Sequence, residues 1–287
     1  MTRTKRYASF AGAGIAVLFI AACSSQPTAP KAAVEKMYVF DCGHIDVGDI
    51  SVFTGQEQDK GKTKPFTVSC YLIEHKNGTL LWDTGLPDAL AQMPNGTKMG
   101  PFTLSVQKPL TAQLKELGYA PENIRYVAFS HMHADHSGNG NSFTKSTVLM
   151  QTEEYNAAFG SEPQKYRFNP DYYGKLKDSK FVKLNGDYDV FGDGSVVIKR
   201  AVGHTPGHQS LYVNLPKSGP VVLSGDIAHF FDNWEHKRVP AFNFDKNASL
   251  ESMENMEKFL KKSGAKLLIQ HDAEQNQKVP HVPQPYL

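Results

Sequence analysis

Residues 130–138, Ser-His-Met-His-Ala-Asp-His-Ser-Gly, place three imidazoles and one carboxylate within six positions of one another. A short apolar run precedes them and predicts a strand that ends here. His131 and His133 lie two residues apart on an extended chain, so both side chains point the same way and can face one cation. Asp135 and His136 follow at a turn and can face a second cation. The segment therefore favours a fold with a metal site at a strand end over a solvated cluster of side chains.

Three further residues follow strand-like runs. His204 comes after residues 196–202, Asp226 after 221–224 and His271 after 266–270. Side chains at strand ends in layered α/β folds gather in one crevice. Each of the three alone is typical of a turn or core residue, but with the first cluster they complete a set of seven. Nitrogen and oxygen donors without thiolate suit zinc, and also manganese, iron or cobalt.

The remaining pattern predicts one α/β layered domain. Asn77-Gly78 between two apolar runs indicates a hairpin. Leucines at helical spacing before Gly118 predict a helix, and residues 250–260 predict another, with Ser249 as its N-cap. Residues 86–105 form a long segment typical of a lid or binding loop, in which Met93, Met99 and Phe102 either line an apolar pocket or pack on the core.

The N-terminus has the three parts of an export signal. Residues 1–22 pass from a basic start into a 13-residue apolar stretch, Phe10 to Ala22, which is shorter than the roughly 20 residues of a membrane-spanning helix. Residues 20–23, Ile-Ala-Ala-Cys, resemble a bacterial lipobox. This implies cleavage before Cys23, lipidation of Cys23 and an exported protein anchored to a bacterial membrane, periplasmic or outer-membrane. Simple secretion is the alternative. Residues 23–35 predict a lipid-anchored tether.

Composition and charge exclude other classes. The chain has 287 residues, of which 40% are hydrophobic and 21% charged, so collagen-like and mainly disordered chains are excluded. Without the three cations of residues 1–22, 28 basic side chains face 29 acidic ones. A balance this close to neutral lacks the electrostatic footprint of nucleic-acid binding. The oligomeric state is not encoded in any pattern that we identify.

Two cysteines lie in the predicted domain. Cys42 and Cys70 both fall in strand-like runs, and an oxidising compartment would permit a bridge between them. Sequence does not give the distance between their Cα atoms, and we expect two separate buried thiols.

The order HxHxDH, His, Asp, His at these separations resembles the metallo-β-lactamase superfamily. The resemblance implies a four-layer αβ/βα sandwich over residues 36–287, with the site at the edge of two sheets. It implies one metal held by His131, His133 and His204, a second by Asp135, His136 and His271, and Asp226 bridging both. Asp83, in Trp-Asp-Thr-Gly, matches the family aspartate that orients a ligand imidazole, although a turn or capping role explains its spacing equally well.

Chemistry follows from two such metals. Two metals at roughly 3.5 to 4 Å would be able to share a water and lower its pKa enough to supply hydroxide near neutral pH, and one of them would polarise the substrate carbonyl. Asp135 is the candidate proton shuttle to the leaving alkoxide, or it is a ligand only. Zinc is the expected metal, with manganese, iron and cobalt as alternatives.

Other motifs of the chain narrow the range of candidate substrates. Asp226 stands where thiolate-using β-lactamases have cysteine, and 16 residues after His271 leave no room for the helical region of glyoxalase II enzymes. Residues 69–74, 205–211, 239–242 and 271–275 are similar to N-acyl-homoserine lactone lactonases. The resemblance implies hydrolysis of the lactone ring, which quenches quorum sensing.

One position departs from this family. Three residues after Asp226 the family has a tyrosine that touches the substrate, and here the residue is His229. We expect His229 to act as a catalytic hydrogen-bond donor, with a surface imidazole as the alternative. The departure leaves open a broader esterase, lactonase or phosphotriesterase using the same ligands. A non-catalytic metal-binding lipoprotein is a third interpretation.

Overall fold

The computed structural model describes residues 1, 2, 4 and 33–287. The predicted signal segment, Cys23 and most of the predicted tether lie outside these residues. The chain separates into Met1–Lys31 and Ala32–Leu287, and the fold below is that of the second unit. Within the described part, we find no helix of the length and apolarity that crossing a membrane requires.

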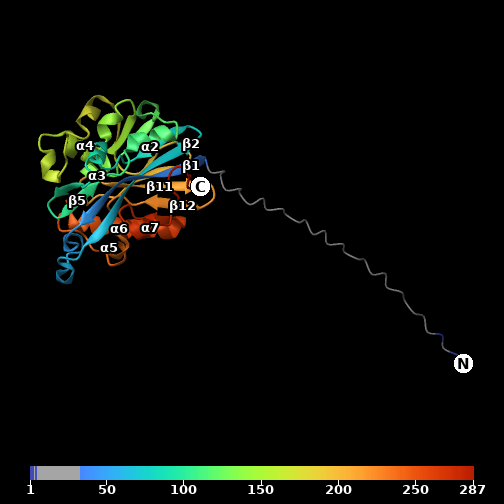
Figure 1. Ribbon diagram of the computed structural model, residues 1–287. Coiled ribbons are helices and arrows are strands. Elements are labelled where there is room, and N and C mark those ends of the chain that lie inside the picture. The colour runs from blue at the N-terminus through green and yellow to red at the C-terminus, as the bar shows by residue number, and fades with distance from the viewer. Residues whose placement is uncertain (3, 5–32) are drawn as a thin grey trace. The chain divides into compact units, whose positions relative to one another are not determined.

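The larger sheet contains eight strands (Figure 1). Their order is β4-β5-β1-β2-β3-β6-β7-β8. It is antiparallel from β4 to β3 and parallel from β3 to β8. The strands are β1 (Val34–Val47), β2 (Lys64–His75), β3 (Gly78–Trp82), β4 (Thr97–Met99), β5 (Phe102–Ser105), β6 (Tyr126–Ala128), β7 (Thr147–Gln151) and β8 (Lys180–Leu184).

The smaller sheet contains five strands in the order β13-β12-β11-β10-β9. Neighbours are antiparallel except β12 and β13, which are parallel. The strands are β9 (Tyr188–Asp189), β10 (Val196–Arg200), β11 (Gln209–Leu215), β12 (Gly219–Leu223) and β13 (Lys266–Leu268).

The helices are short except for one. They are α1 (Ser51–Thr54), α2 (Leu110–Glu116), α3 (Ala134–Ser137), α4 (Thr152–Phe159), α5 (Phe231–Glu235), α6 (Lys246–Ser263) and α7 (Ala273–Asn276). Single 3₁₀ turns occupy Glu57–Asp59, Asp88–Gln92, Pro121–Asn123, Gly140–Ser142, Pro163–Tyr166 and Gly174–Asp178.

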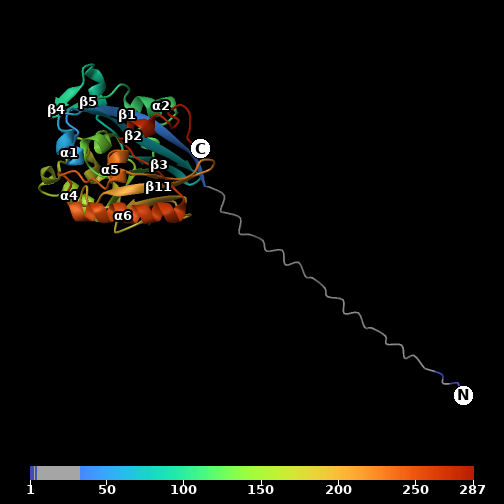
Figure 2. The ribbon, with the colours of Figure 1, turned by 90° about the horizontal axis from the view of Figure 1, so that it is seen from below.

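Three apolar clusters join these elements into four layers. The central cluster lies between the two sheets and contains Ile73, Trp82 and Leu211 among others. A second cluster packs α2 and α4 on the outer face of the larger sheet, and a third packs α6 on the smaller sheet. Figure 2 shows α6 running along the outside of the smaller sheet. The predicted αβ/βα sandwich is confirmed.

Several predicted elements occur where expected. β2 and β3 form the hairpin at Asn77-Gly78, and Gly118 follows α2 with a φ of 82°. β1 begins at Val34, two residues before the predicted domain boundary. The segment 86–105 is less irregular than predicted, since it contains β4 and β5.

The predicted N-cap of the long helix is wrong. α6 begins one turn earlier, where the Asp245 side chain accepts a hydrogen bond from the Ala248 N–H at 2.9 Å. Ser249 lies inside the first turn, and its hydroxyl donates to the Asp245 carbonyl at 2.7 Å. The carboxylate occupies the capping position because Asp245 has the extended backbone that an N-cap requires.

The expectation of two separate thiols is also wrong, because Cys42 and Cys70 form a disulfide with their Cα atoms 5.9 Å apart. The register explains the pairing. Phe40 on β1 lies opposite Cys70 on β2, so Cys42, two residues further on, faces the same side of the sheet. Both cysteines belong to the cluster on the outer face of the larger sheet.

We expect the double variant Cys42→Ala/Cys70→Ala to lower the free energy of unfolding by about 3 kcal/mol. The bridge closes a loop with a sequence separation of 28, and loops of this size give stabilisation of that order. Urea unfolding measures the change. Non-reducing peptide mapping that finds both cysteines as thiols in the native protein would contradict the pairing.

Candidate metal centre

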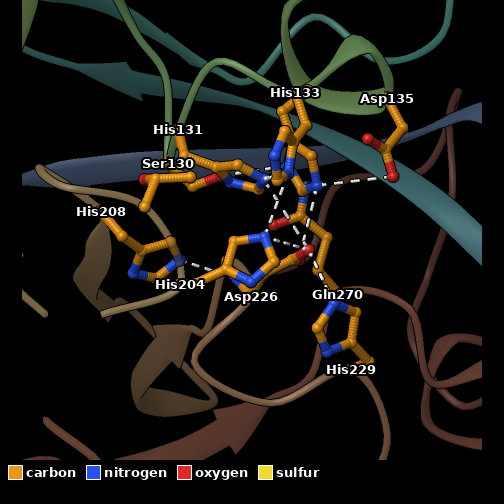
Figure 3. A network of polar contacts seen from close by, with 12 residues as sticks. Ser130, His131, His133, Asp135, His204, His208, Asp226, His229 and Gln270 are labelled. Carbon is orange, nitrogen blue, oxygen red and sulfur yellow. Dashed lines mark hydrogen bonds and ion pairs between the residues drawn. The ribbon is translucent and has the colours of Figure 1, made fainter. Parts of the chain in front are cut away.

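Five strand ends position the site. Asp83 follows β3, residues 131–136 follow β6, His204 follows β10, Asp226 follows β12, and His271 follows β13. β3 and β6 run parallel in one sheet and β12 and β13 run parallel in the other. Their carboxyl ends therefore meet at one edge of the sandwich. Figure 3 shows five of the predicted residues there: His131, His133, Asp135, His204 and Asp226.

Three imidazoles form the first group. His131 Nε2 lies 2.8 Å from His133 Nδ1, which lies 3.1 Å from His204 Nε2. Their donor atoms lie within 4.8 Å of one another, close enough to hold one ion.

The second group joins a carboxylate to two imidazoles. His136 Nε2 and His271 Nε2 are 3.2 Å apart, and Asp135 Oδ2 lies 3.7 Å and 3.6 Å from them. Asp135 and His136 lie on α3, which begins directly after His133, so one turn of helix carries two residues of the second group.

Asp226 lies between the groups. Its Oδ2 is 3.3 Å from His204 Nε2, and its Oδ1 is 3.1 Å from His271 Nε2 and 3.4 Å from His136 Nε2. The carboxylate is 4% exposed, and Oδ1 has no hydrogen-bond partner among the described residues. One oxygen thus faces each group, as a bridging ligand requires.

Each of the five imidazoles has an outer ring nitrogen, which points away from the other donor residues, and each outer nitrogen lies close to an oxygen atom. The pairs are His131 Nδ1 with Ser130 Oγ at 3.1 Å, His133 Nε2 with the Tyr166 carbonyl at 3.1 Å, His136 Nδ1 with Asp83 Oδ2 at 3.0 Å, His204 Nδ1 with Asn243 Oδ1 at 3.0 Å and His271 Nδ1 with the Thr67 carbonyl at 2.8 Å. An outer N–H held by oxygen leaves the inner nitrogen with a lone pair for a metal.

The histidine pKa values differ between the two groups because carboxylates lie closer to the second. Burial lowers the pKa of His131 and His204 well below the usual value and that of His133 to about 4, so the first group is neutral at pH 7. Burial alone would also lower the pKa of His136, but the carboxylates of Asp226, Asp135 and Asp83 raise it well above normal. Burial favours protonation of Asp226, yet His271 and His229 hold its pKa well below the usual range.

These observations fit two divalent cations. Five imidazoles and the Asp135 carboxylate surround the buried Asp226 carboxylate, three of the imidazoles are neutral, and thiolate is absent from the described donor set.

Asp83 is buried, and its carboxylate contacts the His136 ring. Its Oδ1 accepts from the Ser130 N–H at 2.6 Å, and its Oδ2 also accepts from Gln270 Nε2 at 2.8 Å. Its φ is 59°, a left-handed conformation that aspartate and asparagine tolerate better than most residues.

We expect Asp83→Asn to weaken metal binding by about 10- to 100-fold while the fold is kept. The variant preserves the backbone preference but replaces one carboxylate oxygen with an amide NH₂ group, which donates hydrogen bonds and cannot accept them. Chelator competition measures the affinity. Asp189→Asn is the matched control, because Asp189 caps a remote turn through the Gly192 and Gly194 N–H groups. Equal affinities for both variants would contradict the assigned role.

Three residues that contact the predicted donors or Asp83 were not identified from the sequence. His208, which lacks the spacing of a metal ligand in the sequence, is buried and accepts a hydrogen bond from the Asp226 N–H at 2.8 Å through Nε2. Its Nδ1 lies 2.8 Å from the Ala201 carbonyl. Gln270 contacts Asp83, and Asn243 contacts His204. Each is identified only by its position in three dimensions, although His208 lies within the Gly-His-Thr-Pro-Gly-His motif.

A cavity of about 540 Å³ opens onto the cluster. His133, Asp135, His204, Asp226, His229 and His271 line one part of it. The rest is largely apolar and includes Phe53, Phe66, Leu86, Met99, Phe102 and Phe242. Met99 and Phe102 thus line the pocket as one interpretation of the sequence proposed, whereas Met93 is 47% exposed and is not among the lining residues.

Known proteins match both the sequence and the structure. The model of the Metallo-beta-lactamase superfamily matches residues 63–262. An N-acyl homoserine lactonase of Bacillus sp is 32% identical over 251 residues, covering 84% of this chain and 95% of the relative. The lactonase AttM of Azorhizobium caulinodans is 30% identical over 257 residues, covering 83% and 93%.

A solved structure agrees with these relatives. An N-acyl homoserine lactone hydrolase with N-hexanoyl-L-homoserine bound at its catalytic metal centre superimposes with a TM-score of 0.77. Its sequence is 29% identical, and the match covers 88% of this chain and 100% of that chain.

Proposed function

This chain belongs to the metallo-beta-lactamase superfamily, and we propose that it is a dinuclear metal-dependent hydrolase that opens the lactone ring of N-acyl-homoserine lactones. The observation that supports this function most strongly is the position of Asp226, whose two oxygens face two separate donor groups at the end of an apolar cavity. The lactonase relatives and their product complex give the substrate class.

The ligand assignment is part of the proposal. His131, His133 and His204 would hold one cation, Asp135, His136 and His271 the other, and Asp226 both. When bound, two divalent cations would acidify a water molecule and polarise the lactone carbonyl. We propose zinc as the native metal, since it suits these imidazole and carboxylate donors.

The other residues bind substrate and move protons. The apolar side of the cavity is suited to an acyl chain, because burying each CH₂ group contributes about 0.8 kcal/mol. Asp135 lies at the cavity wall with its side chain 20% exposed, so its carboxylate can take the proton that the attacking water releases and pass it to the leaving alkoxide, which becomes the alcohol.

His229 lies beside the reacting centre. Its Nε2 is 3.1 Å from Asp226 Oδ2, its side chain is 3% exposed, and it lines the cavity. Its ring lies 4.7 Å from the Phe53 ring and 6.0 Å from the Phe242 ring. This burial argues against the surface imidazole considered from the sequence, and we propose that the ring binds Asp226 and substrate through its nitrogens.

We expect His229→Phe to lower kcat/KM for lactones by about 10- to 100-fold, the usual cost of losing a group that supports a metal ligand. Phenylalanine keeps the aromatic packing and removes both nitrogens. His229→Tyr, which restores a polar group, should recover part of the loss. Steady-state kinetics on one lactone series measures both variants, and a fully active His229→Phe would remove His229 from the catalytic residues.

We also propose that the protein is exported and anchored to a bacterial membrane through lipid on Cys23. The basic, apolar and lipobox-like parts of residues 1–23 support this proposal. Metabolic labelling with a palmitate analogue, compared between wild type and Cys23→Ala, tests it. Equal labelling of the two proteins would contradict it.

The test of function is a comparison of substrates. Metal-loaded protein is given short- and long-chain acyl-homoserine lactones, p-nitrophenyl esters and a phosphotriester, and proton release is followed. We expect the lactones to give the highest kcat/KM, with all activity lost on chelation. Strong ester or phosphotriester cleavage with weak lactone cleavage would favour the broader hydrolase, and no hydrolysis by fully metallated protein would favour the non-catalytic lipoprotein.

A further inference from the structure

A buried carboxylate lies outside the ring of metal donors. Glu154 is the third residue of α4, is 1% exposed, and does not line the cavity. Its Oε1 accepts a hydrogen bond from the Met132 N–H at 2.9 Å. Its Oε2 accepts from Thr205 Oγ1 at 2.8 Å and from the Gly207 N–H at 2.8 Å. Three donors from two loops therefore share this side chain.

The two loops supply the three imidazoles of the first donor group. Met132 lies between His131 and His133, and Thr205 directly follows His204. These loops are about 70 residues apart in sequence and extend from strands in different sheets, β6 and β10. Glu154 thus joins the two sheets at the point where both contribute to one cation site.

The packing around this contact is close. A Cβ atom on Gly207 would lie 2.4 Å from the Glu154 backbone nitrogen and 2.6 Å from its Cβ, so only glycine allows the second loop to approach α4. Burial raises the pKa of Glu154 to about 7, while the hydrogen bonds from Thr205, Gly207 and Met132 act in the opposite direction. A fully buried carboxylate is costly, which argues that this position has a specific role.

We propose that Glu154 is a positioning residue that fixes the distance between the two loops and so maintains the cation site of His131, His133 and His204. The proposal rests on the ligand assignment made above. It does not involve His136 or His271, whose outer nitrogens are held by Asp83 and Thr67. Loss of Glu154 should therefore weaken one cation much more than the other.

The substitution Glu154→Gln changes the charge and the hydrogen bonds of the side chain while it keeps the size nearly constant. An amide has one acceptor oxygen and one donor nitrogen. If the nitrogen replaces Oε2, it faces the Gly207 N–H, and if it replaces Oε1, it faces the Met132 N–H. In either orientation one loop loses its backbone hydrogen bond, while Thr205 can rotate its hydroxyl to accept.

The experiment is stepwise Co²⁺ binding by the full chain, with chelator competition for affinity and proton NMR for assignment. The shifted ring N–H signals distinguish the sites, because three imidazoles belong to one site and two to the other. We expect Glu154→Gln to weaken the three-imidazole site by about 10- to 100-fold and the second site by less than about 3-fold. Glu153→Gln is the matched control, since Glu153 pairs with Arg200 at 2.7 Å on the surface.

Thr205→Val provides a milder second variant, because it removes one donor from Glu154 at nearly constant volume. We expect it to weaken the same site by several-fold, and it keeps the proposal testable if Glu154→Gln does not fold. Unchanged affinity in the folded variants, or equal weakening of both sites, would overturn the proposal. The readout is metal binding, so an absence of lactone hydrolysis would count against the proposed function and leave this result intact.

Discussion

Asp226→Ala is expected to lose both cations and nearly all activity together. Asp226 is the residue whose Oδ2 and Oδ1 face the two donor groups, and its loss removes a ligand from each. The fall in kcat/KM should exceed the roughly 100-fold that follows loss of a residue that only orients a ligand. Metal analysis after gel filtration, with lactone hydrolysis on the same sample, measures both quantities.

The matched control for this variant is Asp232→Ala. Asp232 lies on α5 with its side chain 45% exposed, in an ion pair with Arg238 outside the cluster. It should retain two cations and full activity. An Asp226→Ala protein with two bound cations and normal kcat/KM would show that Asp226 is not the bridge.

Removal of metal from the wild-type chain should have the second large effect. A chelator is expected to reduce hydrolysis to background, and two equivalents of zinc should restore it in proportion to the metal bound. The midpoint of thermal unfolding should also fall. At a metal concentration of about 1,000 times Kd, binding contributes about 4 kcal/mol, which corresponds to roughly 10 °C for a domain of this size.

Calorimetry with and without chelator measures the shift, and titration of the metal-free protein gives the stoichiometry. An inert chelator analogue is the control for direct effects of the reagent. Full activity at one equivalent would contradict a dinuclear site. Activity in exhaustively chelated protein would contradict metal dependence altogether.

The sequence was sufficient to predict the layers and the set of candidate ligands. Each ligand segment follows an apolar run, and parallel strands such as β12 and β13 bring Asp226 and His271 to the same edge. The structure places six of the seven predicted donors in two adjacent groups of three, with the seventh, Asp226, between them. Their role as ligands stays a prediction that the variants above test.

Other features depend on geometry that no local pattern contains. The disulfide requires the register of β1 and β2, which the sequence does not give. Glu154 belongs to α4, in a stretch where the sequence predicts no helix. Two of its hydrogen-bond partners, Met132 and Thr205, lie 22 and 51 residues away in the sequence. Asp245 and Ser249 are both residue types that favour the N-cap position of a helix. Propensity alone therefore does not choose between them.

The most direct test of the account is hydrolysis of an acyl-homoserine lactone in H₂¹⁸O by the metal-loaded protein. Attack of water on the lactone carbonyl breaks the bond between the acyl carbon and the ring oxygen. Mass spectrometry of the product should therefore find one ¹⁸O atom in the new carboxylate and none in the alcohol. No product, or label in the alcohol, would contradict the proposed lactonase.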